Sequence, residues 1–61
     1  MNREQMCDYI IRRLGFEHKA VIWFFNLLEE YPQATDDKLQ RVLEALLDLI
    51  ELANNLEDVG E

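Results

Sequence analysis

The chain has 61 residues, a net charge of −7, and a composition that is 49% hydrophobic and 31% charged, with two glycines and one proline. A chain of this length has room for one domain with a thin core, which disulfides, a structural metal or self-association usually reinforce. One cysteine and one histidine exclude an internal disulfide and a zinc site built from cysteines and histidines. We therefore expect one ordered helical domain over residues 1–61, reinforced by self-association.

The first predicted helix spans residues 2–14. Asn2 is a good N-cap residue, and Gln5 follows it at the spacing of a capping box. Gly15 is a natural stop because glycine tolerates the backbone conformation that commonly ends a helix. The apolar residues share one face at helical spacing: Met6, Tyr9, Ile10 and Leu14.

The second predicted helix spans residues 17–31 and contains the run AVIWFFNLL, residues 20–28. At 100° per residue its apolar side chains cover an arc of roughly 200°, about twice the stripe of an ordinary surface helix. Pro32 ends the helix, since the residue before a proline is disfavoured in helical conformation. This helix therefore needs cover on more than one side.

The join at Gly15 allows an alternative, because a glycine inside a helix costs only about 1 kcal/mol relative to alanine. Residues 2–31 would then form one kinked helix, and the chain would be a helical hairpin that dimerises into four helices. In length and hairpin layout such a dimer resembles Rop, the small RNA-binding plasmid protein.

The third predicted helix spans residues 36–57, with Thr35 as its N-cap and two aspartates in its first turn. Heptads written from Leu39 place only apolar residues at positions a and d, namely Leu39, Val42, Leu46, Leu49, Ala53 and Leu56. The flanking positions are apolar too, whereas a strict two-stranded coiled coil carries charges there. The fold class we expect is an all-α, small three-helix bundle completed by self-association.

The apolar helix surface exceeds what three short helices can cover, which predicts a homodimer or a higher oligomer. Exposed aromatic and aliphatic residues are typical of protein interfaces. The residues that we expect at this interface lie on the second and third helices: Ile22, Trp23, Phe24, Phe25, Leu47 and Leu52.

Charge is distributed unevenly along the chain. Residues 1–28 hold four basic and three acidic residues, whereas residues 29–61 hold two basic and ten acidic ones. Binding to nucleic acid or to an anionic membrane needs clustered Lys and Arg, so we expect neither as a direct partner. The third helix carries an acidic face made of Glu44, Asp48, Glu51 and Asp58. We expect this face to have one of two roles: it keeps an oligomer soluble, or it binds a basic protein partner.

The sequence gives little sign of catalysis. Cys7 lies beside the apolar face of the first helix and His18 on the polar edge of the second, so the two are on different helices. The chain has no glycine-rich phosphate loop and no EF-hand pattern. We expect no enzymatic activity, no cofactor and no metal.

The beginning of the chain lacks the basic and then apolar order of a secretory signal, and its longest apolar run is well short of the ~20 residues that span a bilayer. With an unpaired cysteine, this favours a cytoplasmic protein. The function that we expect is a non-enzymatic, acidic protein–protein interaction or regulatory module that self-associates. The alternative is an acidic inhibitor that mimics nucleic acid and blocks a DNA- or RNA-binding protein.

Overall fold

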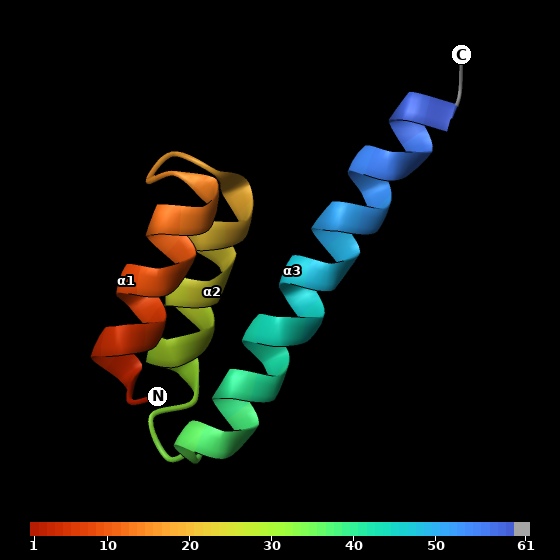
Figure 1. Ribbon diagram of the computed structural model, residues 1–61. Helices are drawn as coiled ribbons and strands as arrows, with labels where there is room; N and C mark the ends of the chain where they lie inside the picture. Colours follow the sequence, from red (N-terminus) through yellow and green to blue (C-terminus); the bar gives the residue numbers. More distant parts are fainter. Residues whose placement is uncertain (60–61) are drawn as a thin grey trace.

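Over residues 1–59, the computed structural model of the chain contains three helices, α1 (Arg3–Leu14), α2 (Lys19–Glu30) and α3 (Asp36–Val59). It describes the backbone of residues 1–59 and the side chains of residues 1–56. Figure 1 shows α1 and α2 side by side as an antiparallel hairpin, with α3 crossing beside them and leaning away toward its C-terminal end. The prediction of a small all-α three-helix bundle is confirmed, and every helix begins and ends within two residues of its predicted bounds.

The break between α1 and α2 lies at Gly15, so the alternative of one kinked helix over residues 2–31 is wrong. Gly15 has φ = 96° and ψ = 149°, a conformation that is largely restricted to glycine. Its amide donates to the Ile11 carbonyl (2.7 Å), which closes the last turn of α1. The chain then reverses, because the positive φ sends it off the helix axis.

Local hydrogen bonds explain where α1 and α2 begin. The predicted capping box is present: the Asn2 side chain accepts from the Gln5 amide (2.8 Å), and the Gln5 side chain accepts from the Asn2 amide (2.9 Å). At the start of α2, His18 Nδ1 accepts a hydrogen bond from the Ala20 amide (3.0 Å). His18 is therefore an N-cap residue, which is why α2 starts at Lys19 and not at residue 17 as predicted.

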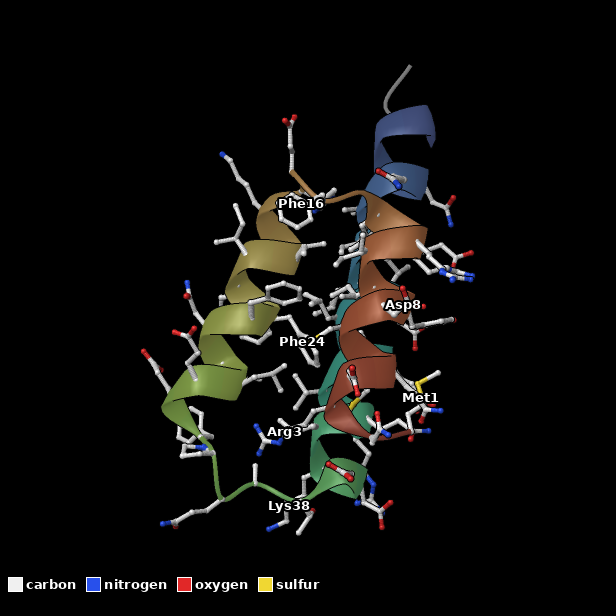
Figure 2. All side chains as sticks on the ribbon, turned by 90° about the vertical axis from the view of Figure 1, so that its left-hand side faces the viewer. Met1, Arg3, Asp8, Phe16, Phe24 and Lys38 are labelled. Atoms are coloured by element: carbon white, nitrogen blue, oxygen red, sulfur yellow. The ribbon has the colours of Figure 1, made fainter. Side chains whose placement is uncertain are left out.

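The core lies where the three helices meet. Each helix contributes two buried side chains, which are 0–2% exposed: Met6, Ile10, Val21, Phe24, Leu39 and Leu43. Figure 2 shows Phe24 pointing from α2 into the space between the helices. Because α1, α2 and the first half of α3 supply all of these residues, the second half of α3 lies outside this core.

Helix lengths explain the overhang of α3. This helix has 24 residues, which corresponds to about 36 Å, whereas α1 and α2 have 12 residues each, about 18 Å. The molecule is accordingly elongated, with extents of 43 × 21 × 18 Å. Every residue of α3 from Glu51 to Leu56 is exposed. A hairpin of two short helices cannot reach this part of α3.

Arg3 fastens the start of α1 to the turn between α2 and α3. Its guanidinium donates hydrogen bonds to four backbone carbonyls, at distances of 2.8–3.1 Å, and these belong to Leu28, Tyr31, Pro32 and Ala34. Figure 2 shows the Arg3 side chain directed at this turn. The carbonyls at the end of α2 have no partner within their own helix, and the helix dipole makes that end negative. The Arg3 guanidinium therefore hydrogen-bonds a carbonyl at the end of α2 and also holds the segment that leads into α3.

Candidate interaction surface

The structure divides the six predicted interface residues into three groups. Ile22, Trp23 and Leu52 are exposed, by 54%, 49% and 58% of their surface. Phe25 and Leu47 are half-buried and pack against the core. The placement of Phe24 at an interface is wrong, because its side chain is fully buried within the chain. A wide apolar arc on α2 predicts that some residues face outward, but only the packing of α1 and α3 decides which ones do.

A second apolar face runs along α3. We call it the outer seam, and it consists of Ala45, Leu49, Leu52 and Leu56. The three leucines are 63%, 58% and 71% exposed. Leu52 lies nine residues, or two and a half turns, after the buried Leu43, so the two side chains point to opposite sides of α3. Heptads written from Leu39 begin on the inner face but place Leu49 and Leu56 of the outer seam at position d, so the heptad pattern alone does not separate the two faces.

A shallow apolar groove adjoins the outer seam. It lies between α2 and the start of α3 and is lined by Leu27, Tyr31, Ala34, Lys38, Leu39 and Val42. Trp23 lies one turn before Leu27 on the same side of α2, and Val42 lies one turn before Ala45 on α3. The groove therefore continues the outer seam toward α2, and the exposed Trp23 lies one turn beyond the groove residue Leu27.

Ile22 belongs to a different part of the surface. The α2 residues one and two turns after it are Asn26 and Glu29, and both are exposed. Its exposed neighbours on this side of α2 are therefore polar, while Phe25, also one turn after it, is half-buried against the core. Ile22 on α2 and Leu52 in the outer seam have nearly equal exposed fractions, and they differ mainly in whether their exposed neighbours are polar or apolar. This similarity makes Ile22 a matched reference for Leu52.

The acidic face lies on a further side of α3. Glu44, Asp48 and Glu51 are exposed, while the side chain of Asp58 lies outside the described residues. Arg13 of α1 lines the same hollow as these three carboxylates, and its guanidinium stacks 5.8 Å above the Tyr9 ring. The basic side chain reduces the negative potential of the acidic face. The acidic face adjoins the outer seam at Leu52, because Asp48 and Glu51 line a second hollow together with this leucine.

The two residues with chemical reactivity lie apart. Cys7 is half-buried in the middle of α1, and burial raises the pKa of its thiol, an effect that nearby Arg3 opposes and Glu4 reinforces. His18 lies in the loop before α2, where its Nδ1 is engaged as a helix cap. Within the described residues, no group of three or more His, Cys, Asp or Glu residues is placed to hold a metal ion. The part of the chain with the most distinctive surface is therefore the outer seam with its groove.

No family model, curated protein or solved structure matches this chain. None of the helices described here is both long enough and apolar enough to cross a membrane. The functional argument therefore depends on the surface of the chain itself.

Proposed function

We propose that this chain is a non-enzymatic, acidic protein–protein interaction or regulatory module that self-associates through its outer seam. The observation that carries the proposal is the row of exposed leucines on the overhanging half of α3. Contiguous exposed apolar patches of this kind mark interaction sites in soluble proteins. The acidic face borders the seam at Leu52 but is centred on another side of α3, so most of it stays in contact with water when the seam is covered and keeps the oligomer soluble.

The size of the leucine row sets the expected strength of association. Complete burial of one leucine is worth about 1.5–3 kcal/mol, so the exposed fractions of Leu49, Leu52 and Leu56 correspond to about 3–6 kcal/mol per copy. Two copies supply about twice that amount, which is similar to the ~4–15 kcal/mol that association costs in lost freedom. We therefore expect a weak and reversible oligomer, in which apolar surface beyond the leucines adds to the affinity.

The test is the molar mass in solution across a range of concentrations, by sedimentation velocity. We expect the mass to rise from that of one chain, 7.3 kDa, toward twice this value as the concentration increases. Leu52→Glu places a charge in the centre of the seam and should keep the chain monomeric. Ile22→Glu adds the same charge at a site of similar exposure outside the seam, and should associate like the wild type.

Two results would contradict the proposal. One is a wild-type chain that stays at 7.3 kDa at the highest concentration. The other is an oligomer that both glutamate variants weaken equally, because charge alone would then explain the effect. Salt provides a further check, since association through apolar burial should persist at high ionic strength while charge-driven docking weakens.

A basic protein partner for the acidic face is a second candidate, and it includes the proposal that the chain mimics nucleic acid. The exposure of Glu44, Asp48 and Glu51 in one row favours it. The position of Arg13 beside that row weighs against it, because a basic groove that binds phosphates would meet a cation there. Self-association therefore ranks first.

A further inference from the structure

The outer seam has the spacing of a two-stranded coiled coil. Its members Ala45, Leu49, Leu52 and Leu56 are separated by four, three and four residues, which is the alternation of the a and d positions of a heptad. Val42, at the edge of the groove, continues the alternation by three residues. The inner face of α3, with Leu39 and Leu43, packs against α1 and α2, so the seam is a different heptad register on the same helix, which shares Val42, Leu49 and Leu56 with the heptads written from Leu39.

We propose that the outer seam is occupied by α3 of a second copy of this chain, running antiparallel, with Leu49 packed opposite the partner's Leu52. This inference rests on the proposed function and specifies its partner, orientation and register. In this register Ala45 faces the partner's Leu56, so the smallest side chain of the seam lies opposite a large one. Each layer of the pair then contains one a and one d position, as knobs-into-holes packing requires.

Charge favours the antiparallel orientation. Lys38 and Arg41 are exposed at the N-terminal end of the outer seam, on the same side of α3, whereas the sequence after Leu56 contains three carboxylates and no basic residue. Asp36 and Asp37 balance these two positive charges over the first turns of α3, so antiparallel packing brings the acidic end of each chain toward a nearly neutral segment whose seam side carries Lys38 and Arg41. Parallel packing would bring the two acidic ends together and would align the two helix dipoles, and both effects are unfavourable.

The lengths of the helices favour the same orientation. In an antiparallel pair, the two α1–α2 hairpins lie at opposite ends, so the overhanging half of each α3 runs beside the other copy's hairpin. The partner's Leu56, opposite Ala45, then approaches the end of the groove that Val42 lines, and Trp23 lies one turn from the groove residue Leu27. A parallel pair would leave both overhanging halves projecting together, with no hairpin beside them. Antiparallel packing therefore covers more of the exposed apolar surface in both copies.

Disulfide trapping tests the register directly. Cys7 is first replaced by serine, and Ala45→Cys and Leu56→Cys are then introduced into separate chains. In the proposed register the two new cysteines face each other across the seam, whereas identical positions in the two copies are eleven residues apart along α3, about 16 Å. A disulfide requires its Cα atoms within about 7 Å. The two chains differ in mass, so mass spectrometry identifies each cross-linked product.

We expect the mixed disulfide to dominate when the two variants are oxidised together, and cross-linking to be lost when either variant is oxidised alone. Disulfides between identical variants would show a parallel dimer, which would overturn this inference while the proposed function stands. A chain that stays monomeric in sedimentation would overturn both. The single tryptophan reports on the groove: its emission should shift to shorter wavelength on dimerisation, and an unchanged emission would contradict the approach of the partner's helix to Trp23.

Discussion

Replacement of Arg3 by alanine should destabilise the chain more than any other change of a single surface charge. The guanidinium contacts the Leu28 carbonyl in the last turn of α2 and three carbonyls in the turn between α2 and α3, and its Nη2 atom serves those three with two hydrogens. The carbonyls of Tyr31 and Pro32 are at exposed positions, so water replaces Arg3 there at little cost. The bonds to Leu28 and Ala34 are partly buried and carry most of the loss.

Two partly buried hydrogen bonds from a charged donor lead us to expect a loss of about 2 kcal/mol in the free energy of unfolding. For a domain of this size, that corresponds to a decrease of roughly 8–16 °C in Tm. Arg3→Lys should lose about half as much, because the ammonium keeps its favourable position at the end of α2 but cannot reach several carbonyls at once.

The assay is urea denaturation followed by circular dichroism, with all variants at one protein concentration because self-association adds to stability. Arg12→Ala is the matched control: its ion pair with Asp8 (3.0 Å) is exposed and should contribute about 0.5 kcal/mol or less. If Arg3→Ala lowered stability no more than Arg12→Ala does, the four contacts would not hold the turn, and the argument from them would fail.

Two other sites of the chain give separate predictions. Gly15→Ala should lower the free energy of unfolding by about 1–3 kcal/mol, because no atom blocks a Cβ there but the backbone has φ = 96°; an unchanged urea midpoint would show that the turn can relax. Cys7 should react with iodoacetamide more slowly in the folded chain than in urea at the same pH, since burial raises the pKa of its thiol and so lowers the thiolate fraction. A folded-state rate that equals or exceeds the unfolded rate would contradict this.

Local features of the sequence were sufficient to predict the helices. The capping box at Asn2, the stop at Gly15 and the break before Pro32 each act within a few residues, so their effects are readable without knowledge of the rest of the chain. The apolar periodicity of α3 is equally local. The role of Arg3 was not predictable in this way, because its four acceptors lie 25 to 31 residues away along the chain.

The sequence by itself determined that this chain is helical, where its helices begin and end to within two residues, and that it has more apolar surface than a thin core can use. Only the tertiary structure decided which apolar residues remain exposed. Phe24 entered the core, while the leucines of the outer seam stayed in water. The physical reason is geometric: periodicity fixes which residues share a helix face, but the lengths and angles of the packed helices decide which faces are covered.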